Sequence, residues 1–217
     1  QFKNIISDYN FMNLEDNIEI RVKDLIFNLS NHIKYVKYLL GYLKEKTINL
    51  SVIHGDPKLS NFLFDIKYKY VVSLIDLDTV SSGYLLTDMA DCLRSICNIV
   101  GEDPSRIDDV YFDIDCFKNF LQGYFSTQNI NSDSCFELLP EYIYIIIVEL
   151  TIRFLNDFLQ SNSYFRVNYQ TQNLHKAEVQ FKLLSSFVSQ TPALLNSLYE
   201  LGITSNLSFI SDVQKIV

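Results

Sequence analysis

The apolar residues of this chain recur mainly at the three- and four-residue spacing of amphipathic helices. Residues 16–30 show a moderate helical pattern, and Ser30 or Asn31 is expected to cap a second helix that ends near Lys46. Thr87 and Asn173 are expected to cap two later helices. Further helices are predicted over 88–100, 112–125, 138–159, 173–190 and 192–201, with a polar loop at 129–134 and breaks at Gly101 and Thr191-Pro192.

Strand character is clear only between residues 51 and 76. Ser51 to Ile53 is a short apolar run, and residues 61–64 and 71–75 are predicted to form a hairpin. Glycine and proline are scarce, with six and four residues in 217, which argues against a turn-dense all-β protein. The chain is therefore expected to be an α+β protein, mainly helical, in which helices pack around one small β-hairpin. Its length fits a single domain over 1–217.

Charge and cysteine usage narrow the possible partners and location. A formal net charge of −8 disfavours nucleic acid and anionic membranes, because binding to phosphate needs clustered Lys and Arg. The most apolar run, 142–155, contains two charged residues and is too short to span a bilayer. The four cysteines lack both C-x-x-C and zinc-ligand spacing, so we expect reduced thiols in the cytoplasm. They are Cys92, Cys97, Cys116 and Cys135.

The hairpin region concentrates oxygen ligands in a short stretch. Asp56 follows an apolar strand, Asn61 comes five positions later, and Asp76 ends the next strand. Because the ends of neighbouring strands lie close together, these three side chains are expected to converge. Phosphoryl transfer needs a carboxylate to accept the proton of an alcohol, here Asp56, and hard oxygen ligands for Mg²⁺, here Asn61 and Asp76. In the alternative interpretation, each residue only caps a turn.

The three histidines are not expected to act as bases. His54 is expected to be a structural hydrogen-bonding residue beside the Asp56 loop, and His32 and His175 are expected to be exposed on helices.

The segment HGDPKLSNFLFD at 54–65, followed by IDLDTV at 75–80, resembles the signature of the aminoglycoside phosphotransferase and choline kinase superfamily. Within it, TDMAD at 87–91 with Arg94, and ELTIRFLND at 149–157, resemble the N-acetylhexosamine kinase group. The resemblance covers roughly residues 50 to 185. It implies the C-terminal lobe of a protein-kinase-like fold, with the catalytic loop and hairpin at about 51–80, and ATP and Mg²⁺ as cofactors.

The resemblance also implies further roles by position. Asp78 is implied to assist through a second metal or its waters, and Asp88 to brace the catalytic loop. The remaining implied positions bind the substrate and are Lys58, Arg153 and Tyr164.

Each of these positions also has a plainer interpretation. Lys58 can be a solvated loop charge, and Arg153 can pair with Glu149 four residues earlier in one helix. Tyr164 is one of 14 tyrosines, and Asp88 can complement the dipole of a helix start.

A complete kinase of this type has an N-terminal nucleotide lobe, which is expected to be absent from this chain. The six glycines stand apart, so there is no G-x-G-x-x-G, and the first 50 residues are predicted to be helical. The missing lobe is a candidate partner.

Two classes of function follow. The first is an ATP-dependent small-molecule kinase that phosphorylates a hydroxyl of a sugar such as an N-acetylhexosamine, with aminoglycosides or choline-type alcohols as alternative acceptors. The second is a non-catalytic split or degenerate kinase lobe, which the intact Asp56, Asn61 and Asp76 argue against.

Overall fold

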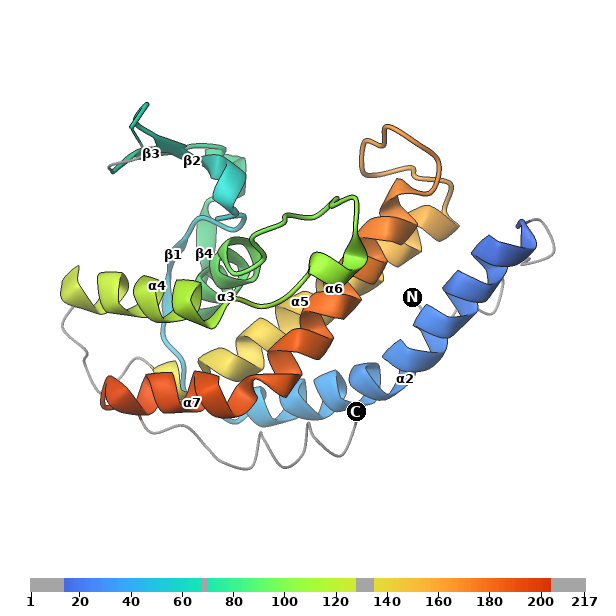
Figure 1. Cartoon of the computed structure of the whole chain (residues 1–217). Coiled ribbons are helices and arrows are strands. Elements are labelled where there is room, and N and C mark those ends of the chain that lie inside the picture. The colour runs from blue at the N-terminus through green and yellow to red at the C-terminus, as the bar shows by residue number, and fades with distance from the viewer. Residues whose placement is uncertain (1–13, 68–69, 128–134, 204–217) are drawn as a thin grey trace.

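A body of helices carries two small β-sheets at one end (Figure 1). The computed structural model describes residues 14–67, 70–127 and 135–203. The α-helices of this part are α2 (Asp16–Lys44), α3 (Leu85–Ile96), α4 (Ile114–Thr127), α5 (Leu139–Leu159), α6 (Gln172–Ser189) and α7 (Thr191–Glu200). The strands are β1 (Leu50–Ile53), β2 (Phe62–Phe64), β3 (Val71–Leu74) and β4 (Ser81–Tyr84). Short 3₁₀ turns are η2 (Leu59–Asn61), η3 (Leu77–Thr79), η4 (Ile107–Asp109) and η5 (Phe136–Leu138).

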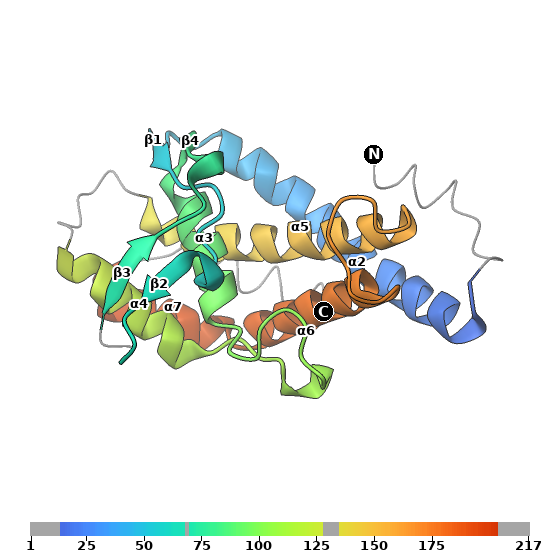
Figure 2. The same ribbon diagram turned by 90° about the horizontal axis from the view of Figure 1, so that it is seen from above.

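Helix α5 runs through the middle of the body, as Figure 2 shows, and contacts α2, α3, α6 and α7. Its apolar run is buried on more than one side, with Ile143, Ile147 and Val148 fully enclosed. This confirms the long helix predicted over 138–159. A second, smaller apolar cluster forms where the first half of α2, at Val22 and Leu29, packs against the end of α5 and the start of α6. These contacts hold the second half of α5, which carries Arg153, against α2 and α6.

The predicted hairpin is present as β2 and β3, which pair antiparallel with Phe62 opposite Leu74. The sequence did not indicate β4, which pairs antiparallel with β1 and places Ile53 opposite Ser81. The sequence of β4, Ser-Ser-Gly-Tyr, has little strand character, and the pairing depends on a close approach. A Cβ at Gly83 would lie 2.3 Å from Ile53 Cδ1, so a larger residue at this position would require the Ile53 side chain to move.

Three predicted helix starts are wrong. Helix α2 continues through Ser30, whose hydroxyl donates to the carbonyl of Phe27 at 2.7 Å instead of capping a new helix. Helix α3 begins at Leu85, directly after β4, so Thr87 lies within its first turn. Helix α6 begins before Asn173, which is buried and bonded to neighbouring side chains. The predicted break at Thr191-Pro192 is confirmed, since α7 begins there.

His32 is buried, and the expectation of an exposed residue is wrong. Its Nδ1 shares a hydrogen bond with the hydroxyl of Tyr144 at 2.7 Å, and burial lowers the pKa of the imidazole to about 4. It is therefore neutral in the core. His175 is half-buried, and its Nε2–H donates to the carbonyl of Pro104 at 2.7 Å. Both histidines face the interior because their helices pack on other elements at these positions.

The remaining expectations concern cysteines, the membrane and one loop. All four cysteines are free thiols, two of them buried. Among the described helices, none combines the length and the apolar character that a bilayer span requires. The polar loop predicted at 129–134 lies outside the described residues.

Candidate active site

The loop that follows β1 carries the predicted base. Gly55 adopts a positive φ of 86°, and a Cβ there would lie 2.7 Å from the carbonyl oxygen of Thr79. The hydroxyl of Thr79 donates to the carbonyl of His54 at 2.7 Å. Glycine at this position therefore lets the loop lie directly against η3, which carries Asp78.

Asp88, in the first turn of α3, receives two hydrogen bonds from the same loop. The backbone N–H groups of His54 and Gly55 donate to its two carboxylate oxygens at 2.5 and 2.9 Å. Hydrogen bonds to a charged acceptor are among the stronger ones in proteins. These contacts hold the start of the loop against helix α3.

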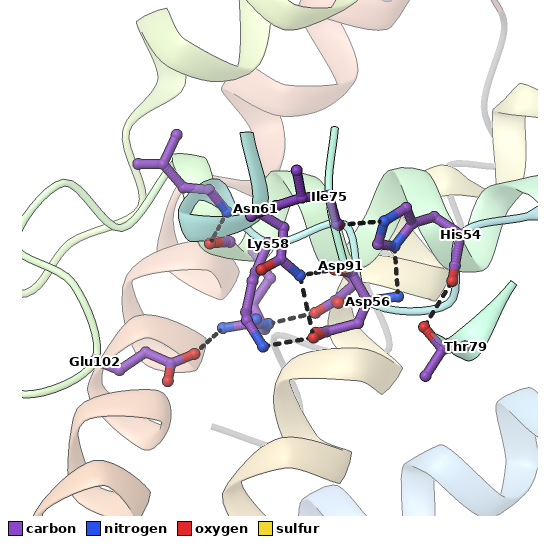
Figure 3. Close-up of polar contacts among 11 residues, drawn as sticks. His54, Asp56, Lys58, Asn61, Ile75, Thr79, Asp91 and Glu102 are labelled. Carbon is purple, nitrogen blue, oxygen red and sulfur yellow. Dashed lines mark hydrogen bonds and ion pairs between the residues drawn. The ribbon is translucent and has the colours of Figure 1, made fainter. Parts of the chain in front are cut away.

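His54 connects the loop to the end of β3. Its Nε2 lies 2.9 Å from the carbonyl oxygen of Ile75, and its Nδ1 lies 3.3 Å from the backbone nitrogen of Asp56. A neutral ring protonated on Nε2 satisfies both contacts, donating to Ile75 and accepting from Asp56. Both ring nitrogens are thus engaged with backbone groups, and the ring is placed between Asp56 and the residue that precedes Asp76 (Figure 3).

Asp56, Lys58 and Asn61 are in direct contact, as Figure 3 shows. The ammonium of Lys58 lies 2.5 Å from Asp56 Oδ2. Asn61 is buried, and its amide donates to the backbone carbonyl of Asp56 at 2.8 Å and to Oδ2 at 3.3 Å. The Asp56 carboxylate is therefore oriented by an amide and a cation that both come from its own loop.

Asp76 stands at the junction of β3 and η3. Its backbone lies in the left-handed region, with φ 67° and ψ 56°, which is uncommon for a residue other than glycine. The preceding N–H, of Ile75, donates to the carbonyl of Asn61 at 2.9 Å. This bond joins the segments that carry the two predicted metal ligands, and Asp78 follows within η3.

The oxygen ligands in this region are few. In the part of the chain that the structure describes, no three His, Cys, Asp or Glu side chains are grouped to hold a metal ion. Asn61, Asp76 and Asp78 offer one amide and two carboxylates. That set suits Mg²⁺, which commonly takes one or two carboxylates and completes its shell with water and substrate phosphates.

A pocket of about 530 Å³ opens beside Asp56, and we call it the acceptor pocket. Its wall includes Asp56 and Lys58 from the loop, Arg153 from α5, and Tyr164 from the loop after α5. Packing thus brings the predicted base and the three predicted substrate-binding residues to one cavity. Asp88 also lines it.

Arg153 does not form the intrahelical ion pair considered as an alternative. Glu149 also lines the pocket, but within the described residues no ion pair joins the two. The guanidinium lies instead over the ring of Phe165, 5.6 Å from its centroid. Its charge therefore borders the cavity without a carboxylate partner among the described residues.

The loop that carries Tyr164 and Phe165 is organised by Asp157. This buried carboxylate accepts the backbone N–H groups of Tyr164 at 2.8 Å and of Phe165 at 3.0 Å. The side-chain amide of Asn173 also donates to it, at 2.8 Å. One buried charge at the end of α5 thus sets the position of this side of the pocket.

A buried cation lies deeper in the same wall. Arg94 is 2% exposed, and its guanidinium pairs with Asp91 at 2.8 Å and with Glu102 at 2.9 Å. The triad ties helix α3 to the segment after it.

Sequence reasoning assigned no role to Asp157, Phe165 or Glu102. Asp157 ends a strongly apolar helix, which is an unusual place for an unpaired acid and could have indicated a structural anion. Phe165 and Glu102 carry no local signal, because their positions depend on long-range packing.

A comparison with known families matches the segment that contains this loop. Residues 30–122 match the family model described as the phosphotransferase enzyme family. The matched segment contains Asp56, Asn61, Asp76 and Asp88, whereas Arg153 and Tyr164 lie beyond it. Over the part that carries the loop and both small sheets, the chain is therefore similar to phosphotransferases of the kinase type.

Proposed function

We propose that this chain is the catalytic and acceptor-binding lobe of an ATP-dependent kinase that phosphorylates a hydroxyl of a small molecule, a sugar such as an N-acetylhexosamine. The observation that carries the proposal is the shared pocket. Asp56, held by Asn61 and Lys58, borders the same cavity as Arg153 and Tyr164. A base thus lies next to a space of about 530 Å³, which suits a molecule of sugar size.

In this proposal Asp56 orients the acceptor hydroxyl and accepts its proton as the oxygen attacks the γ-phosphorus. Asn61 restricts the carboxylate through its amide. Lys58 lies at the Asp56 oxygen and is placed to stabilise the negative charge of the transferring phosphoryl group. His54, Thr79 and Asp88 are proposed to hold the loop in this conformation through the contacts described above.

Asn61 and Asp76 are the proposed Mg²⁺ ligands, with Asp78 assisting. The metal would supply charge neutralisation on the phosphate oxygens of ATP. Its protein ligands fit by their chemistry, and the bond from Ile75 N–H to the Asn61 carbonyl holds the two ligand-bearing segments together. The left-handed backbone of Asp76 is a further sign of a functional constraint, because such strain persists where the surroundings enforce it.

Arg153 and Tyr164 are proposed to bind the acceptor. A guanidinium with no carboxylate partner in the described part favours a neutral, hydroxylated acceptor over a cationic one. The preference for sugars over aminoglycosides and choline-type alcohols rests on this one cation, because Asp88, Asp91, Glu102 and Glu149 line the same cavity. Tyr164 is largely exposed at the pocket wall, where its ring offers a stacking surface and its hydroxyl a hydrogen-bond partner.

We also propose that a nucleotide-binding lobe covers the strands. The two sheets expose many large apolar side chains, and Ile66, next to the β2–β3 hairpin, is 97% exposed. An exposed apolar surface of this kind is typical of an interaction site. Its members are Leu50, Val52, Leu63, Phe64, Ile66, Tyr70, Val71, Val72, Ile75, Leu77, Val80 and Tyr84. Figure 1 shows the hairpin projecting from the helical body, where a second lobe has room to pack.

Transfer of phosphate from ATP and Mg²⁺ to a panel of N-acetylhexosamines, aminoglycosides and choline tests the function. The chain is compared with any longer natural form of it, to establish whether further sequence supplies the nucleotide lobe. Transfer to a hexosamine supports the proposal. Transfer only to an aminoglycoside or to choline would show that the acceptor is a cationic molecule and not a neutral sugar. Absence of transfer from both forms to every acceptor would favour the non-catalytic lobe.

A further inference from the structure

A second groove of about 560 Å³ adjoins the acceptor pocket. Five residues line both cavities, namely Lys58, Arg94, Glu102, Phe154 and Phe165. Others line only the second, and we define the distal groove by Ser60, Ser95, Asn98, Ile99 and Lys176. It lies between the end of α3 with η2 on one side, and α5, α6 and the Phe165 loop on the other.

The lining of the distal groove combines aromatic rings with hydrogen-bonding groups. Phe154 and Phe165 pack against each other at 4.9 Å between centroids, and the Lys176 ammonium lies 5.4 Å from the Phe154 centroid. The Ser95 hydroxyl accepts the backbone N–H of Leu59 at 2.9 Å, so its hydrogen can donate to a ligand oxygen. Apolar faces with a few polar groups are typical of small-molecule sites, and a sugar ring offers both a C–H face and hydroxyls.

Asn98 is a buried polar residue in the groove wall. The residue is buried, and its amide nitrogen donates to the carbonyl of Gly101 at 2.6 Å, another residue of the groove wall. Its Oδ1 is buried and has no donor within the described part of the chain. A buried acceptor without a donor is unfavourable. This oxygen has almost no accessible surface, so a ligand hydroxyl in the groove meets it only if the Asn98 side chain turns towards the groove.

Lys58 connects the two cavities. Its ammonium lies 2.5 Å from Asp56 Oδ2, and its side chain borders both spaces. A molecule with one ring beside Asp56 can therefore extend past Lys58 towards Asn98. Resting on the proposed function, we propose that the acceptor is a disaccharide, whose reacting ring lies in the acceptor pocket and whose second hydroxylated ring lies in the distal groove.

Binding of sugars to the chain, without nucleotide, tests this inference. Titration calorimetry compares N-acetylglucosamine with its β-1,4-linked disaccharide. We expect the disaccharide to bind about tenfold more tightly, because the second ring adds hydrogen bonds and stacking. Ile99→Trp, at a position 58% exposed, fills the groove without disturbing the core and should remove this advantage while leaving monosaccharide affinity unchanged. Ile20→Trp on α2, at a position 60% exposed, is the matched control.

A second variant avoids dependence on one bulky substitution. Lys176→Met keeps the apolar stem and removes the charge, and it should reduce the disaccharide preference severalfold. Equal affinity of the wild-type chain for the two sugars, or a preference that survives Ile99→Trp, would overturn the inference and leave the monosaccharide kinase standing. Binding of neither sugar would overturn the sugar-acceptor proposal together with this inference.

Discussion

The carboxylate of Asp157 accepts the backbone N–H of Tyr164 at 2.8 Å, and through this bond the end of helix α5 positions one wall of the acceptor pocket. The same carboxylate accepts the N–H of Phe165, over whose ring Arg153 lies. In the proposed function Asp157 is thus a positioning residue, which would act on the acceptor only through Tyr164, Phe165 and Arg153.

Asp157→Asn should disturb acceptor binding selectively. The amide cannot accept from all three donors, so the loop loses about 1.5–3 kcal/mol of stabilisation. We expect KM for the acceptor to rise about tenfold while KM for ATP stays constant, in steady-state kinetics with each substrate varied. Asp108→Asn, on an exposed turn, is the control. An equal rise in both KM values would contradict a local role.

Arg153→Met should weaken binding of the acceptor without lowering the stability of the fold. The guanidinium has no ion-pair partner in the described part, and Met keeps the apolar stem. Loss of charged hydrogen bonds to the acceptor should lower kcat/KM by about 10- to 100-fold. The midpoint of thermal unfolding should be unchanged, as in the exposed control Arg106→Met. Full activity of Arg153→Met would show that this residue does not contact the acceptor.

Asp88→Asn should act on turnover and on stability together. Its carboxylate accepts two backbone N–H groups from the loop that carries Asp56, and an amide can replace only one of these bonds well. We expect the free energy of unfolding to fall by about 1–3 kcal/mol. We also expect kcat to fall by a larger factor than KM for the acceptor rises, because the lost bonds hold the loop that carries Asp56. Urea unfolding and kinetics measure the two effects, and unchanged kcat would refute the bracing role.

The burial of Glu141 should make the free energy of unfolding depend on pH, independently of catalysis. Burial raises the pKa of this carboxyl from its ordinary 4.5 to about 7, and its Oε2 has no partner in the described part. The folded state therefore holds the proton more tightly than the unfolded state. The stabilisation is fully present below about pH 4.5 and is lost as the pH rises to 7. At about 1.4 kcal/mol per pKa unit, the loss attributable to Glu141 is about 3 kcal/mol.

Glu141→Gln should remove that part of the pH dependence, because the amide stays neutral. Urea unfolding at pH 5, 6, 7 and 8 should show that the free energy of unfolding of the variant increases relative to that of the wild type with each rise in pH. A constant difference between the two proteins across this range would contradict a buried, protonated Glu141.

The sequence predicts the elements that depend on local pattern. Helix α5 and the β2–β3 hairpin lie within a few residues of their predicted bounds, because a long apolar helical pattern and two short apolar runs separated by a turn are visible in the sequence. Strand β4 could not be predicted, since Ser-Ser-Gly-Tyr has little strand character and forms a strand by pairing with β1, which is distant in the sequence. The helix caps predicted at Ser30 and Thr87 are wrong for the same reason. Polar residues that favour caps also occur inside helices that packing stabilises.

In the candidate site too, some contacts could be predicted from the spacing of residues and others depend on tertiary packing. Asp56 and Asn61 are five positions apart, so their proximity could be predicted, and the hydrogen bond between them agrees with that expectation. The Arg153–Phe165 contact and the anchoring of Tyr164 by Asp157 depend on how the end of α5 meets the following loop. Their geometry is set by tertiary packing and carries no signature in the spacing of residues.

The initial rate of phosphoryl transfer from ATP and Mg²⁺ to N-acetylglucosamine, with and without Asp56→Asn, tests the central claim most directly. The rates are measured in the chain and in any longer natural form of it, with Asp24→Asn on the exposed face of α2 as the matched control. Loss of the proton acceptor should reduce kcat by about 10²–10⁴-fold, while Asp24→Asn remains fully active. Transfer at the wild-type rate by Asp56→Asn, or no transfer by the unmodified protein, would contradict the account.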